Sequence, residues 1–123
     1  MSLWGVEELL AKTEELGRAG GRVENDALRA GAKVIEEAAK EEVPERTGQT
    51  REDIGIVGKV RKRGGTKTIR VGATTGRSST VIYFLERGTS TMSANPFLSR
   101  AFHSNKDAAN KAMLETLRKG LGL

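Results

Sequence analysis

The most concentrated group of charged side chains in the chain is a cluster of cations. Six of them fall within twelve residues, with no acid among them: Lys59, Arg61, Lys62, Arg63, Lys67 and Arg70. Such a cluster can neutralise several phosphates of a nucleic acid or bind an acidic protein surface. It can also keep an exposed strand edge from pairing with another sheet. No aromatic residue lies between them to stack on bases, which argues against single-strand binding.

Other residue types give little reason to expect catalysis. The chain has no cysteine and a single histidine, His103, so the usual nucleophilic triads and strong zinc sites are not available. A functional imidazole needs partners, and we therefore expect His103 to be structural or solvated. Adjacent carboxylates such as Glu7 and Glu8 diverge by about 100° on a helix and do not converge on one substrate atom. The glycine-containing segment 72–80 lacks the Gly-Lys-Ser/Thr ending of a phosphate loop. We expect no enzyme, no cofactor and no metal.

Length and charge suggest one domain with two unlike parts. A chain of 123 residues is long enough to fold around a single core, so we expect one domain over 1–123. Residues 1–45 carry a net charge of −5 and residues 46–123 a net charge of +10. This asymmetry fits a nucleic-acid face or self-association between unlike surfaces. We see neither a leader peptide nor an apolar run long enough for a membrane span, and expect a soluble, non-secreted protein.

The first 53 residues should be mainly helical. Apolar spacing predicts a short amphipathic helix over 2–16 and a longer one over 22–42. The glycine-rich segment 17–22 between them predicts a hinge or break, although a continuous, weakened helix is also compatible. Pro44 ends the long helix, and residues 44–53 form a loop.

A β-hairpin should carry the cation cluster. A two-residue turn at Gly64-Gly65 places Arg63 opposite Thr66 and, in the same register, Gly58 opposite Val71. One face then collects apolar side chains, namely Ile54, Ile56, Val60, Ile69, Val71 and Ala73. The other face is basic, with Lys59, Arg61, Arg63 and Arg70. A one-residue slip would mix the two faces, so the pattern itself favours this register.

The last third should contain a central strand, a corner and a helix. Residues 81–86 (VIYFLE) are apolar on both faces, which is typical of a strand covered on two sides. Gly88 would let the chain turn out of that strand. Asn95 would cap a C-terminal helix with Pro96 at its first position. This helix has one broad apolar face: Phe97, Ala101, Phe102, Ala109, Ala112, Met113 and Leu117. The predicted fold class is α+β, with a long N-terminal helix, an antiparallel sheet of three to four strands and a C-terminal helix packed on the sheet.

Two stretches resemble a known protein family. VPERTGQTREDI (43–54) resembles the Pro-x-x-Thr-Gly signature of tailed-bacteriophage tail-completion, or head-tail joining, proteins. YFLERGTSTMSANPFLSRAF (83–102) resembles the Glu-x-Gly-Thr to Pro-Phe stretch that precedes the last helix in that family. The motif residues in this chain are Pro44, Thr47, Gly48, Glu86, Gly88, Thr89, Pro96 and Phe97. The resemblance runs from about residue 23 to residue 119 and leaves the N-terminal 21 residues without a signature.

The resemblance implies a non-enzymatic virion component. Members of this family form a ring, often of six subunits, between the capsid connector and the tail, and DNA passes through the lumen. We therefore expect a homo-oligomer with connector-side and tail-tube partners, made in the host cytoplasm and located in the virion neck or tail. In that setting the cation cluster would dock an acidic neighbour and meet DNA without specific binding. The alternative function is a small basic nucleic-acid-binding module that uses the 59–70 hairpin.

Overall fold

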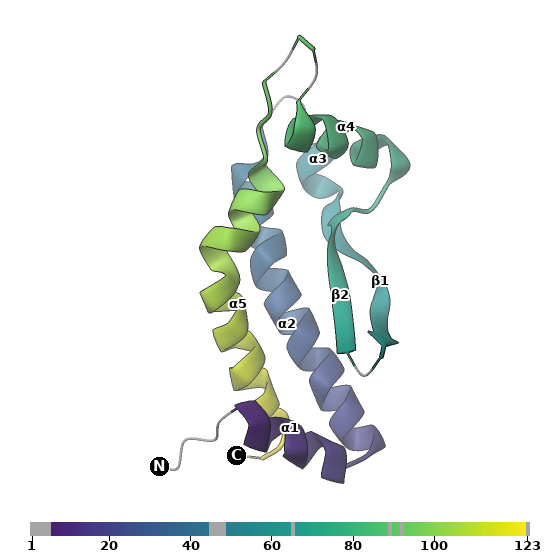
Figure 1. Cartoon of the computed structure of the whole chain (residues 1–123), viewed down its shortest axis with the longest axis vertical. Helices are drawn as coiled ribbons and strands as arrows, with labels where there is room; N and C mark the ends of the chain where they lie inside the picture. The colour runs from purple at the N-terminus through teal and green to yellow at the C-terminus, as the bar shows by residue number, and fades with distance from the viewer. Residues whose placement is uncertain (1–5, 45–48, 65, 89, 92, 123) are drawn as a thin grey trace.

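The protein is a long helical pair with a β-hairpin beside it (Figure 1). The computed structural model describes residues 6–44, 49–64, 66–88, 90–91 and 93–122. The elements in chain order are α1 (Val6–Glu15), α2 (Arg18–Glu42), α3 (Gln49–Glu52), β1 (Ile54–Arg63), β2 (Thr66–Ala73), α4 (Gly76–Arg87) and α5 (Phe97–Gly120). Helices α2 and α5 run side by side along the long axis, and the hairpin packs on α2. This confirms the α+β class, the long N-terminal helix and the C-terminal helix. The C-terminal helix was predicted to pack on the sheet, but α5 packs mainly on α2.

The glycine-rich segment breaks the helix at one point only. Gly17 has a φ of 60°, and α2 begins directly after it at Arg18. Gly20 and Gly21 lie inside α2, so the predicted long helix starts four residues earlier than expected. The break lets α1 fold back across the ends of α2 and α5, where Leu9 is buried with Ala27 and Leu117.

Small residues allow α2 and α5 to approach closely. Gly31 and Ala27 of α2 are buried, as is Ala109 of α5. A Cβ atom at Gly31 would lie 2.7 Å from Cγ of Met113 and 3.3 Å from the carbonyl oxygen of Ala109. Because any larger side chain would push the helices apart, the alanine and glycine stripe of α2 fixes their separation.

The hairpin confirms part of the predicted register and corrects the rest. Near the turn, Arg63 pairs with Thr66, Lys62 with Lys67 and Arg61 with Thr68, as predicted. Beyond Arg61 the register shifts, so that Val71 pairs with Ile56 and not with Gly58.

A bulge causes this shift. Three residues of β1, 58–60, lie opposite the single residue Ile69, and Gly58 adopts a φ of 74°. The shift is by two residues, an even number, so the apolar side chains stay on the face that was predicted for them.

The predicted central strand is wrong. Residues 81–86 belong to α4, and the described residues form a two-stranded sheet in place of three or four strands. The side chain of Thr75 caps the helix by accepting the Ser78 backbone N–H at 3.2 Å. Ser78 and Ile82, four residues apart, are buried on one helical face, and Leu85 packs against the same core. A short apolar run fits either a strand or a buried helix, and the cap and the spacing decide for the helix.

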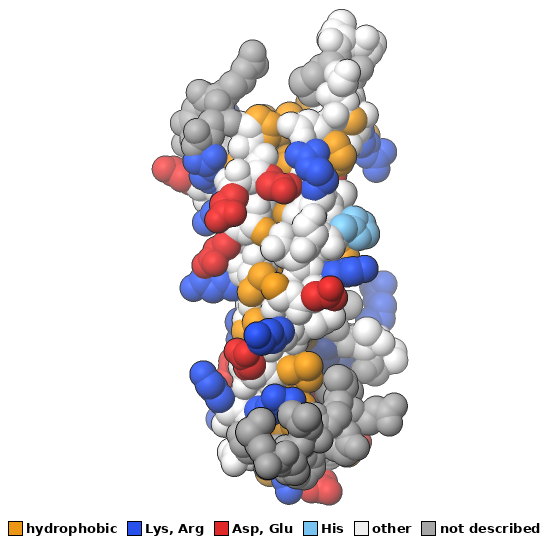
Figure 2. Space-filling model, turned by 90° about the vertical axis from the view of Figure 1, so that its left-hand side faces the viewer, with side chains coloured by type: hydrophobic (Ala, Val, Ile, Leu, Met, Phe, Trp, Pro, Cys, Tyr) orange, Lys and Arg blue, Asp and Glu red, His pale blue; other side chains and the backbone are white. Residues whose placement is uncertain are grey.

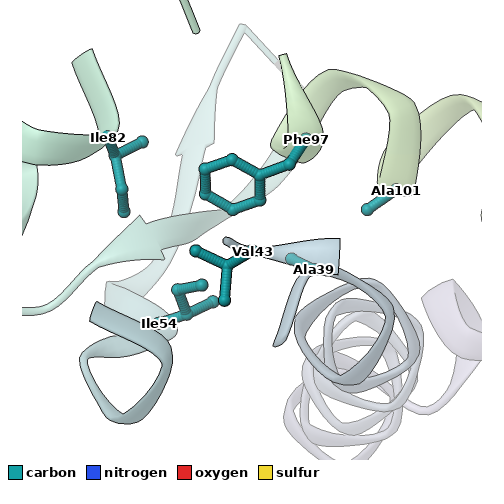
Figure 3. Packing of buried hydrophobic residues seen from close by; sticks show 6 residues of the cluster. All are labelled: Ala39, Val43, Ile54, Ile82, Phe97 and Ala101. Carbon is teal, nitrogen blue, oxygen red and sulfur yellow. The ribbon is translucent and has the colours of Figure 1, made fainter. Parts of the chain in front are cut away.

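The main core lies at the junction of α2, α4, α5 and the hairpin (Figure 3). Its buried members are Ala39, Val43, Ile54, Ile82, Phe97 and Ala101. The Phe97 ring is fully buried and points into the space between Ile82 and Val43. Phe102 was predicted in this core but is 51% exposed. Among the aromatic residues that the structure describes, Phe97 alone is buried in the core.

Candidate functional site

Five of the six predicted cations are exposed on the hairpin. They are Lys59, Arg61, Lys62, Arg63 and Arg70, and we call them the basic hairpin surface. Lys59 lies in the bulge, while Arg61 to Arg63 end β1 next to the turn. The hairpin therefore presents the same charge along its length and at its end, where a partner can reach it.

The sixth cation, Lys67, is used inside the molecule. Its Nζ lies 3.7 Å from a carboxylate oxygen of Glu24, 3.2 Å from Oδ1 of Asn25 and 3.4 Å from the carbonyl oxygen of Gly21. Lys67 belongs to the same alternating row of β2 as Ile69 and Val71, which are partly buried. Its ammonium therefore docks the hairpin on α2. The position of Lys67 in this partly buried row is the sequence signal that distinguishes it from the five exposed cations.

Acidic side chains of α1 and α2 are exposed elsewhere. They include Glu14, Glu15, Asp26, Glu37 and Glu41. Two of them have a basic neighbour on the same helix, with Lys12 at 3.6 Å from Glu15 and Arg29 at 3.8 Å from Asp26. Figure 2 shows acidic and basic side chains interspersed along one long face, with hydrophobic side chains between them. The strongly basic end of the hairpin thus contrasts with helical surfaces of mixed or acidic character.

The second predicted motif forms a corner between two helices. Gly88 ends α4 with a φ of 77° and donates its N–H to the carbonyl of Phe84 at 2.7 Å. The predicted role of Gly88 in a turn is thus confirmed, but the turn leaves a helix and not a strand. Thr89 lies outside the described residues, as do Thr47 and Gly48 of the first motif, whereas Pro44 is exposed just after α2.

Glu86 caps the C-terminal helix. Its Oε1 accepts the backbone N–H of Leu98 at 2.7 Å, and its Oε2 accepts the hydroxyl of Ser99 at 2.8 Å. Asn95 was predicted as the cap, but Pro96 occupies the N-cap position and α5 starts at Phe97. Proline has no side-chain acceptor, so the Glu86 carboxylate of α4 accepts the free N–H at the start of α5 in its place. A negative charge there also complements the helix dipole.

A second polar cluster, which the sequence did not reveal, fixes the start of α4. Oδ2 of Asp53 accepts the hydroxyls of Ser78 at 2.6 Å and Thr75 at 3.2 Å. The carbonyl of Asp53 accepts the backbone N–H of Thr74 at 2.7 Å. These groups are more than twenty residues apart in sequence, so no local spacing points to them. Their contacts hold the start of α4 against Asp53, the residue directly before β1.

No constellation of reactive groups appears in the described part of the chain. His103 is exposed on α5, with its ring 5.4 Å from that of Phe102. Among the described residues, no three His, Cys, Asp or Glu side chains come together as a metal site. No described helix is long and apolar enough to cross a membrane. The most distinctive exposed groups of the described residues are the cations of the basic hairpin surface.

Fold and site together define a small α+β protein with a cluster of cations exposed on its hairpin. A family model described as "Bacteriophage HK97-gp10, putative tail-component" matches residues 7–88, about two thirds of the chain. The chain belongs to this family of bacteriophage tail components. No match was found among curated proteins or among solved structures.

The family match confirms the resemblance and changes its extent. The matched range begins at residue 7 and thus includes most of the N-terminal part, for which no signature was recognised. It ends at Gly88, so Glu86 and Gly88 lie inside it whereas Pro96 and Phe97 lie outside. A tail component is a structural part of the virion, and this places the chain in that class.

Proposed function

We propose that the chain is a head-tail joining, or tail-completion, subunit that forms a homo-oligomeric ring between the capsid connector and the tail. The observation that carries this proposal is the concentration of exposed cations on the hairpin of a tail-component protein whose helices expose acids and bases together (Figure 2). The basic hairpin surface lies on β1 and β2, and exposed acids lie on α1 and α2. A ring needs such heterologous contacts, in which one surface of a subunit meets a different surface of the next.

The hairpin in this proposal docks an acidic surface of a neighbouring subunit or of a ring partner. The anchor of Lys67 on Glu24 and Asn25 fixes the hairpin relative to α2, so the exposed cations are held in place before they bind. Preorganisation of this kind lowers the entropy lost on association. DNA passes through the lumen of the ring and is not gripped, because tight binding would oppose its passage.

Mass photometry of the chain mixed with its connector and tail proteins tests the proposal. We expect ring-sized complexes that are lost when Arg61 and Arg63 are both changed to Glu. The matched control is Lys111→Glu with Lys119→Glu, which alters the net charge equally on exposed positions of α5. A chain that stays monomeric with both partners present contradicts the proposal, as does equal loss of complexes in the two double variants.

The second candidate function is a nucleic-acid-binding module, which the five exposed cations of the hairpin favour. That function requires duplex binding whose log affinity falls with log salt by about 0.9 per phosphate contacted. It also requires loss of binding when Arg61, Arg63 and Arg70 become Ala. If the Lys111→Glu, Lys119→Glu chain loses as much binding as the hairpin variant, the effect follows net charge and not the hairpin, and this candidate is removed.

A further inference from the structure

Helix α4 presents an exposed apolar face that its own fold does not use. Val81 is 40% exposed, Tyr83 54% and Phe84 45%. The rings of Tyr83 and Phe84 pack edge to face with centroids 5.7 Å apart, and the guanidinium of Arg87 lies 4.8 Å from the Tyr83 centroid. We call Val81, Tyr83 and Phe84 the aromatic ridge. Large apolar side chains gathered on a surface mark an interaction site more often than isolated ones do.

A groove of matching chemistry lies elsewhere on the molecule. It has a volume of about 480 Å³, with α2 as its floor and with β2 and α5 as its walls. Its apolar lining includes Leu28, Ile35, Ile69, Val71, Phe102 and Met113. The half-exposed Phe102 ring stands in its wall, which explains why this residue is not part of the core. We call this cavity the apolar groove.

The ridge of a subunit is turned away from that subunit's own core. Ile82, at the centre of the same helix, is buried in the main core with Phe97. Successive residues on a helix are rotated by about 100°, so Val81 and Phe84 lie on other sides of α4 than Ile82. Moving the ridge into the subunit's own groove would pull Ile82 and Ser78 out of their buried positions. The ridge can therefore enter a groove only on another molecule.

We propose that the aromatic ridge of one copy of this chain seats in the apolar groove of the next copy. Ridge and groove are different surfaces, so the contact is head to tail, and it closes into a ring if the rotation between copies permits. Buried tyrosines and other aromatic anchors in pockets carry much of the energy in protein interfaces. The inference rests on the proposed ring function and identifies the contact that would hold neighbouring subunits together.

Self-complementarity and area favour a second copy as the occupant. Both halves of the contact lie on this chain, since α4 carries the exposed ridge and residues of α2, β2 and α5 line the apolar groove. A standard interface buries about 800 Å² per partner. That is roughly a tenth of the 8442 Å² surface of this chain, so one subunit can carry two such contacts. The ridge and groove would form the apolar centre, and the charged residues around them the polar rim.

Cross-linking tests the contact directly, because the natural chain contains no cysteine. The chain with Phe84→Cys and Phe102→Cys together is concentrated and treated with a short bis-maleimide. We expect a ladder of covalent dimers and higher oligomers on a denaturing gel. Either substitution alone should give monomer, and an equal mixture of the two single variants should stop at the dimer. Both positions are about half exposed, so the variants should unfold at the temperature of the natural chain.

A second double-cysteine variant tests whether the result depends on a local effect of one substitution. Val81→Cys with Asn110→Cys places thiols on the ridge and on the groove lining and should give the same ladder. Monomer alone from both double variants overturns the inference, and so does a dimer from Phe84→Cys by itself, which would mean that ridge packs on ridge. Rings seen by negative stain without a ladder would contradict the ridge-groove contact but not the proposed function. A ladder without binding to connector or tail proteins would support the contact and contradict the proposed function.

Discussion

The carboxylate of Glu86 accepts the backbone N–H of Leu98 at 2.7 Å and so joins the last turn of α4 to the first turn of α5. The same corner buries Phe97 and places Gly88 at a positive φ. The corner therefore has a structural purpose that does not depend on any reaction. It sets the direction in which α4 presents its exposed face.

Removing this carboxylate should weaken the protein. Glu86→Ala deletes the acceptor for Leu98 and the favourable charge near the start of α5, and we expect a loss of about 1 kcal/mol in the free energy of unfolding. Glu86→Gln keeps an acceptor and should lose less. Urea unfolding at neutral pH measures both. The matched control is Glu37→Ala, an exposed position of α2, which should change stability by under about 0.5 kcal/mol. Equal effects at both positions would show that the cap contributes nothing.

Phe97 and Phe102 should respond very differently to truncation. Phe97 is completely buried, so Phe97→Ala should cost about 3 to 5 kcal/mol of stability. Phe102 is 51% exposed, and Phe102→Ala should cost the isolated chain far less. Thermal or urea unfolding of the two variants compares them directly. Similar losses at the two sites would contradict the placement of Phe97 in the core.

The positive φ of Gly88 should make this position intolerant of side chains. Gly88 has a φ of 77° and a ψ of 176°, a region that is essentially restricted to glycine, so Gly88→Val should cost about 1 to 3 kcal/mol. The control is Gly76→Ala at the start of α4, where no atom lies within 4 Å of an added Cβ. That change should be neutral or slightly stabilising. If Gly88→Val melted with the natural chain, the corner would not need a glycine.

Lys67 should hold the hairpin to α2, whereas its cross-strand neighbour Lys62 should not. Lys67→Met keeps the length of the side chain but removes the bonds to Glu24 and Asn25, with an expected loss of about 1 kcal/mol. Hydrogen exchange of the hairpin amides should accelerate as well. Lys62→Met, at the exposed position directly opposite, should alter neither quantity measurably. Faster exchange in both variants alike would argue against an anchor at Lys67.

Local patterns in the sequence predicted the elements that depend on local forces. The spacing of apolar residues gave the long α2, and the turn glycines gave the register from Arg61 to Arg63. The bulge at Gly58 was missed because an even shift leaves the alternation of faces unchanged. Hydrophobic alternation therefore cannot detect it.

The wrong predictions concern features that depend on contacts between distant parts of the chain. Residues 81–86 suit a buried strand as well as a helix, and the cluster of Asp53 with Thr75 and Ser78 helps to fix the start of the helix. The cap of α5 comes from Glu86, twelve residues before Leu98, although Asn95 was the nearer candidate. Among the site residues, five cations were correctly placed on the surface. Lys67 differs because the carboxylate that pairs with it lies on another element.

Complementation of phage assembly tests the central proposal most directly. Infected cells that lack this chain should accumulate DNA-filled heads and separate tails, which electron microscopy can count. Adding the purified natural chain should produce joined particles, and adding the Arg61→Glu, Arg63→Glu double variant should not. Complete, joined particles in the absence of the chain would contradict its assignment as a joining subunit.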